Sequence, residues 1–416
     1  MTRRALTRSP SSVERAVTAD GASRPDLIQR LAVAQAERER QSLLRRLRTV
    51  DAVDGARIVI DGKALLNFAS NDYLGLARHP ALIEALTRSA AQWGVGATAA
   101  HLLGGHRDEH AALEAKLARW TGRDRALLFS AGYMANLGAL HALVGAGDVC
   151  VQDKLNHASL LDAARLSGAD LCRYVHADVA SAQRQLEARG DAPALLATDG
   201  VFSMDGDVAP LAALAQLCAT QAATLMVDDA HGIGVLGPDG TGSLGEAALA
   251  QDDVPVLMAT LGKALGVGGA FVAGSAALID GLVQFARTHV YTTALPPALA
   301  SAASAAVDIA RFESWRRSKL TRLIAHFRHG AAERGIIVMA SRTPIQPVAI
   351  GSSRAALKAM RALESEGFFV PAIRPPTVPQ GKARLRVVLC ALHEEGDVEQ
   401  LLNALARALG QARDHA

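Results

Sequence analysis

The sequence is poor in the features that mark membrane-spanning, disulfide-stapled and zinc-bound proteins. Its four cysteines, Cys150, Cys172, Cys218 and Cys390, stand far apart without a C-x-x-C pair, which excludes a disulfide framework and a zinc knuckle. No apolar run reaches the ~18 residues that a membrane span requires. Aromatic residues make up only 4% of the chain, so a large core must come from aliphatic side chains. We therefore expect a cytoplasmic protein without a membrane partner.

Basic residues gather at one end of the chain. The first 50 of the 416 residues hold 11 arginines against 5 acids, so the other 33 basic and 36 acidic residues leave a net charge of −3. A body with that balance offers no electrostatic basis for binding nucleic acid. Residues 1–24 are rich in Arg, Ser and Thr but lack the apolar core of a secretory signal. We expect them to form a disordered extension, with a transit peptide as the alternative.

A helix and a hairpin are predicted next. Pro25 and Asp26 are typical of a helix start, and leucines at positions 27, 31, 43, 44 and 47 predict an amphipathic helix with an Arg-rich polar face. Asp61 and Gly62 predict the turn of a hairpin over 57–68. We treat 25–68 as an N-terminal helix and hairpin segment.

Short apolar strands alternate with helices from residue 126 onward. This βαβ pattern predicts a largely parallel sheet covered by helices on both faces, and the fold class is α/β. The last strand follows its predecessor too closely for a crossover helix, so we expect it to be antiparallel. A large domain over 69–313 then contains a seven-stranded sheet, and a smaller α+β domain follows over 314–416. The expected strands are 126–129, 149–151, 171–175, 194–197, 225–227, 254–258 and 270–273.

One lysine is set among glycines at the end of a predicted strand. Lys263 follows the apolar run 254–258, and four glycines stand between 262 and 269. Because a free lysine titrates near ~10.4, it acts as a nucleophile only with a lowered pKa or through an imine. Ala264 replaces the Ser or Thr of a Walker-type phosphate loop, which excludes that motif. For this stretch alone, a lysine in a surface turn remains the alternative.

Two acids and a histidine follow another predicted strand. Asp228, Asp229 and His231 come at the end of the apolar run 225–227, where α/β sheets bind their ligands. A carboxylate there, with a lysine one strand later, fits pyridoxal phosphate. The acid keeps the pyridine nitrogen protonated, the lysine forms an imine with the aldehyde carbon, and His231 can bond the ring hydroxyl. In isolation, the acids are also typical of a helix cap.

A strand-to-helix junction supplies a candidate phosphate site. The stretch from Ser130 to Asn136 would present free N–H groups at the positive end of a helix. Many such turns look alike, but a pyridoxal phosphate site elsewhere favours this one as the phosphate cradle. The hydroxyl of Thr260 would assist it.

Three motifs resemble those of the α-oxoamine synthases, a family of fold-type I pyridoxal phosphate enzymes. The likeness runs from about Leu43 to the last helix, and it implies a homodimeric transferase that condenses an amino acid with an acyl thioester and releases CO₂. Stretches 200–207 and 372–379 are similar to the family member that takes L-alanine and pimeloyl-CoA, or a pimeloyl-carrier protein, in biotin biosynthesis. The motifs are Asn71-Asp72-Tyr73-Leu74-Gly75, Asp228-Asp229-Ala230-His231-Gly232 and Thr260-Leu261-Gly262-Lys263.

The same resemblance implies roles for single residues. Thr292 or Thr293 of a second subunit would reach the cofactor, so the active site would be shared between two subunits. The implied catalytic residues are Lys263, which moves the α proton, His157, which stacks on the ring, Asp228 and His231. The implied cofactor contacts are Gly132, Tyr133, His157, Ser203, Asp228, His231, Thr260 and Lys263. The implied substrate contacts are Arg45, Asn71, His157, Thr377 and Arg386.

Two arginines alternate on one predicted strand. Arg384 and Arg386 would share one face, and a guanidinium fork suits a substrate carboxylate. The family resemblance favours Arg386 for that role, with Asn71 assisting. Surface ion pairing is the alternative, above all for Arg384.

Three other functions stay open at this point. Glycine-using members of the family, of the 5-aminolevulinate synthase and 2-amino-3-ketobutyrate CoA ligase types, share the core motifs. A non-catalytic scaffold could keep the fold without the chemistry. His106, Glu109 and His110 match the H-x-x-E-H pattern of inverted zinc proteases, which would place two histidines and a glutamate on one helical face, although such short patterns arise often by chance. We expect no metal.

Overall fold

The computed structural model describes residues 26–413 as two compact units, one up to Leu47 and one from Arg48 onward. The first unit contains helix α1 (Leu27–Arg40), which begins after Asp26 as predicted, because the Asp26 carboxylate accepts from the amides of two residues in the first turn. The prediction that this helix continues to residue 47 is wrong. Ser42 adopts a φ of 58°, and the Leu43 amide donates to Arg38 O, which closes the helix end. Residues 1–24 lie outside the described part.

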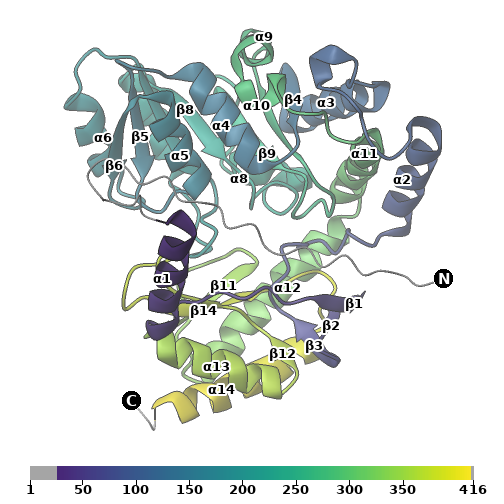
Figure 1. The fold of residues 1–416 in the computed structure, drawn as a ribbon, viewed down its shortest axis with the longest axis vertical. Helices are drawn as coiled ribbons and strands as arrows, with labels where there is room; N and C mark the ends of the chain where they lie inside the picture. Colours follow the sequence, from purple (N-terminus) through teal and green to yellow (C-terminus); the bar gives the residue numbers. More distant parts are fainter. Residues whose placement is uncertain (1–25, 414–416) are drawn as a thin grey trace, which may run out of the picture. The chain divides into compact units, whose positions relative to one another are not determined.

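A seven-stranded sheet forms the core of the upper part of the second unit as drawn in Figure 1. Its strand order is β4-β10-β9-β8-β7-β5-β6, and only β10 runs against its neighbours. This confirms the predicted α/β sheet, including the reversed strand after Lys263. The strands are β4 (Arg125–Phe129), β5 (Val149–Asp153), β6 (Asp170–Tyr174), β7 (Ala194–Asp199), β8 (Thr224–Asp228), β9 (Val256–Thr260) and β10 (Ala270–Gly274).

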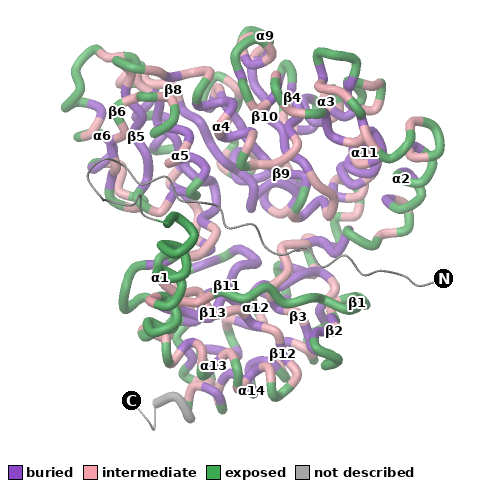
Figure 2. The backbone as a smooth tube through the Cα atoms, in the orientation of Figure 1, coloured by how far each residue is buried: buried purple, intermediate pink, exposed green. Residues whose placement is uncertain are grey.

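Helices cover both faces of this sheet because its strands are apolar on both sides. Met226 packs in the cluster under α4, α5 and α9, whereas Leu225 and Val227 pack under α6 and α7 on the opposite face. Figure 2 shows the central strands buried along their length. The covering helices are α4 (Gly132–Leu143), α5 (Ala158–Ser167), α6 (Val179–Glu187), α7 (Leu211–Thr220) and α9 (Ala276–Phe285).

Two smaller sheets lie in the rest of the second unit. The predicted hairpin is confirmed as β2 (Arg57–Ile60) and β3 (Lys63–Asn67), and β1 (Val50–Asp54) extends it. The short strand β12 (Phe368–Phe369) pairs in parallel with β3, so the hairpin joins the C-terminal part of the chain. The other sheet has the order β11-β14-β13, with β11 (Ile345–Gly351), β13 (Ala372–Ile373) and β14 (Ala383–Val388).

The remaining helices surround these sheets. α11 (Pro297–Phe312) breaks from α12 (Ser314–Glu333) at Glu313, where the smaller domain was predicted to begin. Within residues 26–413, every helix is too short or too polar to cross a lipid bilayer. The others are α2 (Pro80–Trp93), η1 (His101–Leu103), α3 (Asp108–Thr121), η2 (Pro238–Gly240), α8 (Gly242–Glu246), α10 (Arg287–Val290), α13 (Ser353–Ser365) and α14 (Glu395–Arg413).

Candidate active site

Polar side chains gather at the carboxyl edge of the central sheet. Asp153, Asp199, Asp228 and Thr260 are the last residues of β5, β7, β8 and β9. The register pairs Asp199 with Asp228, so the two carboxylates lie on adjacent strands at the same level. This is the edge at which parallel α/β sheets bind ligands.

Lys263 lies in the tight connection between β9 and β10. The Gly266 amide donates to Lys263 O at 2.8 Å, and Gly266 has a φ of 66°. A Cβ on Gly266 would stand 2.4 Å from the Ala77 amide nitrogen, so only glycine fits there. Burial lowers the pKa of the Lys263 amine, against the carboxylates of Asp228 and Asp199, which raise it. The lowered pKa makes the uncharged amine, the form that acts as a nucleophile, more accessible than in a free lysine.

His231 connects this lysine to a buried tyrosine. Its Nε2 lies 2.9 Å from Lys263 Nζ, and its Nδ1 lies 2.6 Å from the hydroxyl of Tyr73. Burial, followed by the positive charge of Lys263, lowers the pKa of His231 well below its usual value, so the ring stays neutral. Burial also raises the pKa of Tyr73 to about 12, which keeps its hydroxyl as a donor. Tyr73 belongs to a motif noted above, but no role was predicted for it.

A buried asparagine links Asp228 to His157. Asn136 Nδ2 donates to Asp228 Oδ2 at 2.7 Å and to Ser159 Oγ at 2.8 Å. Ser159 Oγ lies 2.7 Å from Nδ1 of His157, which forms the N-cap of α5. This chain of hydrogen bonds, from Asp228 through Asn136 and Ser159 to His157, fixes the orientation of the imidazole relative to the Asp228 carboxylate. Asn136 was named only as the end of the predicted phosphate cradle and Ser159 was not predicted, because Asn136 lies 92 residues from Asp228 and 23 residues from Ser159.

The two neighbouring acids of the Asp-Asp pair have different surroundings. Asp228 Oδ1 accepts from the Ala230 amide, whereas Asp229 Oδ2 accepts from the Ser243 amide at 2.8 Å. A Cβ on Gly242 would stand 1.9 Å from Asp229 Oδ2, so this carboxylate packs tightly against backbone. Burial raises the pKa of Asp229 to about 7. Asp229 is therefore structural, and Asp228 is the acid available to a ligand.

A third buried acid lies beside them. Asp199 Oδ1 accepts from the His157 amide at 3.3 Å. Burial and the negative charge of Asp228 raise the pKa of Asp199 well above its ordinary value. Asp199 is therefore harder to ionise than an ordinary carboxyl group. The sequence did not single it out.

The start of α4 lies next to Thr260, as the predicted phosphate cradle requires. A Cβ on Gly132 would come 4.0 Å from Thr260 Cβ. Ala131, the N-cap of α4, provides no side-chain cap for the first amides of the helix, so these can bind an anion. Thr260 Oγ1 donates to Gly269 O at 3.0 Å, and the Tyr133 ring lies edge-on to His157 with centroids 6.4 Å apart.

Arg386 contributes a buried cation to the same cluster. Its Nε donates to Ser203 O at 2.7 Å, and Nη1 and Nη2 reach Asn71 Oδ1 at 3.3 and 3.2 Å. Asn71 Oδ1 also lies 3.3 Å from the Tyr73 hydroxyl, which is 2.6 Å from His231 Nδ1, so polar contacts connect Arg386 with the Lys263–His231 pair. Arg384 pairs instead with Asp205 at 2.5 Å, so the alternative of ion pairing is right for that residue, but the pair is buried and not on the surface as expected.

Three predicted site residues lie apart from these contacts or are only partly engaged. Ser203 is half-buried and contributes its carbonyl oxygen to Arg386. Thr377 lies exposed in the turn after the cis Pro375–Pro376 bond, and its amide donates to Arg374 O. Arg45 belongs to the first compact unit, beyond the end of α1.

The histidines of the zinc alternative are used differently. α3 begins at Asp108, so His106 precedes the helix and the expected shared helical face is wrong. His110 Nδ1 accepts from the Arg107 amide at 2.8 Å, and its Nε2 donates to Leu295 O at 2.6 Å. Both ring nitrogens are therefore occupied by backbone groups. In the described part of the chain, no three or more His, Cys, Asp or Glu side chains are arranged to hold a metal ion.

The donor set of this cluster fits pyridoxal phosphate. Lys263 supplies an amine of lowered pKa, Asp228 an oriented carboxylate, and α4 a helix start for the phosphate.

Comparison with known proteins gives a consistent result. Residues 63–405 match the family described as aminotransferase class I and II. The 8-amino-7-oxononanoate synthase of Hahella chejuensis is 53% identical over 380 residues, covering 91% of this chain and 96% of the relative. That of Alkalilimnicola ehrlichii is 55% identical over 377 residues, covering 90% of this chain and 96% of the relative.

Solved structures resemble the fold over most of its length. A serine palmitoyltransferase from S. paucimobilis, with a bound aldimine of pyridoxal phosphate and myriocin, superposes with a TM-score of 0.89 at 26% identity. That alignment covers 94% of this chain and 100% of the other. An 8-amino-7-oxononanoate synthase from Francisella tularensis gives a TM-score of 0.73 at 29% identity, covering 83% of this chain and 98% of the other.

Proposed function

This chain belongs to the aminotransferase class I and II family and, within it, to the 8-amino-7-oxononanoate synthases; from this premise we propose that it condenses L-alanine with a pimeloyl thioester in biotin biosynthesis, with pyridoxal phosphate as cofactor. The observation that carries the proposal is the Lys263 amine, 2.9 Å from a neutral His231 in the same cluster as Asp228. CO₂ and the free thiol leave, and the amino ketone is the product.

The cofactor would be held by residues from four strand ends. Lys263 would bind its aldehyde carbon and Asp228 its ring nitrogen, with His157 against the ring. Thr260 and the first amides of α4 at Gly132 and Tyr133 would hold the phosphate. When bound, pyridoxal phosphate supplies an electron sink for the negative charge that develops at the α carbon of the amino acid.

The protein's own groups would orient the amino acid and move its proton. The Nη1 and Nη2 groups of Arg386, together with Asn71, would bind the alanine carboxylate, while Nε of Arg386 keeps its bond to Ser203 O. The Lys263 amine would take the α proton, and burial, which lowers its pKa, makes its unprotonated form more accessible for that step. The new bond joins the α carbon to the thioester carbonyl carbon as the thiol departs. His231 and Ser203 would contact the ring oxygen, and Thr377 and Arg45 the substrates.

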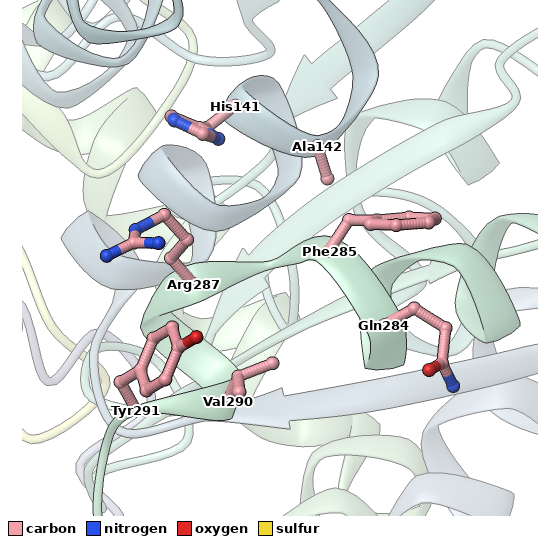
Figure 3. A pocket seen from close by; sticks show the side chains of 7 residues that line it. All are labelled: His141, Ala142, Gln284, Phe285, Arg287, Val290 and Tyr291. Atoms are coloured by element: carbon pink, nitrogen blue, oxygen red, sulfur yellow. The ribbon is translucent and has the colours of Figure 1, made fainter.

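We also propose that two copies form a homodimer that shares its active sites. Tyr291 and Phe285 are 72% and 66% exposed beside a cavity of about 380 Å³, and the Arg287 guanidinium lies 4.9 Å from the Tyr291 ring centroid (Figure 3). Large exposed aromatic side chains of this kind are typical of protein interfaces. Tyr291 directly precedes Thr292 and Thr293, the residues expected to reach a second subunit's cofactor.

We retain a boundary near residue 313 between a large cofactor domain and a smaller C-terminal domain, supported by the break between α11 and α12.

All four cysteines are unpaired and buried, which supports a reducing compartment, the cytoplasm.

Absorbance and steady-state assays test the proposal. The protein mixed with pyridoxal phosphate should develop an imine band that Lys263→Ala abolishes; a band that persists in that variant would refute the role of Lys263, and no band in the wild type would favour a scaffold. Turnover with alanine, glycine and serine against several acyl thioesters should favour alanine with a pimeloyl thioester. A clear preference for glycine would move the protein to the glycine-using relatives.

A further inference from the structure

A short turn, residues 202–207, connects the central sheet to the C-terminal part of the second unit. It is closed by hydrogen bonds from the Gly206 amide to Phe202 O at 2.8 Å and from the Phe202 amide to Asp207 O at 3.0 Å. Val201 and Val208 pair on either side of it. Gly206 adopts a φ of 72°, which favours glycine.

Side chains of the C-terminal part bind backbone carbonyl oxygens of the 202–207 turn. Ser341 and Thr343 each donate a hydroxyl to Gly206 O at 2.8 Å. Arg386 donates to Ser203 O, and Arg384 pairs with Asp205 with 6% and 14% of their side chains exposed. The guanidinium of Arg386 is thus aligned by a carbonyl of this turn.

On the sheet side, one histidine holds the turn. His176 Nε2 lies 2.8 Å from Asp207 Oδ2, and its Nδ1 lies 3.0 Å from Asp153 Oδ1. Asp153 is anchored at the end of β5, since it also accepts from the Leu155 and Ala177 amides at 2.8 Å each. The His176 ring stands edge-on to Phe202, with centroids 4.4 Å apart and an 89° angle between the planes.

The partners of His176 define its charge. Ionised carboxylates only accept hydrogen bonds, so a ring bonded to one carboxylate through each nitrogen must carry both protons. Burial alone would lower the pKa of His176, but the hydrogen bonds and charges of Asp153 and Asp207 outweigh it and raise the pKa to about 10. The histidine is therefore a fixed imidazolium between two carboxylates.

We infer that His176 is a positioning residue: its imidazolium ties the 202–207 turn to Asp153 and thereby holds Ser203 O where it aligns Arg386 for the carboxylate of the amino-acid substrate. The inference rests on the proposed function for the identity of that substrate. Without the tie, Asp207 loses its cation and the turn is held from the C-terminal part alone. The guanidinium of Arg386 then samples more orientations before substrate binds. Ordering the guanidinium on binding costs free energy, so the affinity for the substrate falls.

Kinetics of matched variants test this. His176→Gln should raise KM for alanine roughly tenfold with kcat within about twofold, since uniform binding is lost. Asp207→Leu should behave in the same way. Asp207→Asn keeps an oxygen for the His176 Nε2–H and should stay near the wild-type KM. A wild-type KM in His176→Gln would overturn the inference, and so would Asp207→Asn variants as impaired as Asp207→Leu.

A second readout does not depend on turnover. Nitrogen-15 NMR of histidine-labelled full-length protein at pH 8 should show both His176 ring nitrogens protonated, with assignment by His176→Gln. A neutral ring at that pH would overturn the inference. If the wild type shows the charged ring but never turns over alanine with a pimeloyl thioester, the proposed function fails while the tie to the turn stands.

Discussion

Asn136 offers the sharpest test of how the candidate site is organised. Its amide makes two buried hydrogen bonds, to Asp228 Oδ2 and Ser159 Oγ, and the residue is fully buried. Asn136→Leu keeps the volume but removes both donors. A hydrogen bond to a buried charged group contributes about 2 kcal/mol, and if the loss falls on cofactor binding it weakens the affinity about 30-fold.

Titration of cofactor-free protein with pyridoxal phosphate, followed by imine absorbance, measures that affinity, and thermal unfolding without cofactor measures the share that falls on folding. Ser159→Ala is the matched control, because it removes the hydrogen bond toward His157 while the Asn136–Asp228 contact stays. Its effect should be clearly smaller. Wild-type affinity and melting temperature in Asn136→Leu would refute the view that Asn136 orients Asp228.

Three other outcomes are expected. Gly206→Ala should lower the free energy of unfolding in urea by about 1–3 kcal/mol, because a Cβ would stand 2.3 Å from Ile345 O. The control Gly190→Ala, at a φ of 61° but with open space around the Cβ, should lower it less. Equal losses in the two variants would show that the contact with Ile345 O is not the cause. Folding raises the pKa of His176 from 6.5 to about 10, so the charged ring should stabilise the fold fully below pH 6.5 and lose this effect as the pH rises through 10. The difference in free energy of unfolding between the wild type and His176→Gln should therefore shrink over that range. A difference that stays constant would contradict this. A chelator should leave turnover unchanged, because backbone groups occupy both nitrogens of His110, and metal-dependent activity would revive the zinc alternative.

Local patterns in the sequence predicted most of the framework. Alternating apolar runs predicted the seven strands and the reversed β10, and the acids and lysine at strand ends pointed to one edge of the sheet. The structure brings Lys263, His231 and Arg386 together from segments that the motifs had marked separately. The strands were predicted correctly because each apolar run extends over several residues and such runs recur along the chain.

The unpredicted features depend on contacts between distant segments. Asn136 lies 92 residues from Asp228, and Tyr73 lies 158 residues from His231, so no local pattern pairs them. The end of α1 was missed because the left-handed Ser42 leaves no periodic signal. The pairing of β12 with β3 was missed because a two-residue strand is too short to predict.

The pairing of β3 with β12 has a consequence for synthesis of the chain. The edge of β3 finds its neighbour only when Phe368 and Phe369 have left the ribosome, some 300 residues after Leu66. Until then, a nascent polypeptide displays an open strand edge, a template for wrong partners. A premature stop before residue 368 should therefore yield aggregating fragments even though every residue of the cofactor-binding sheet has been translated.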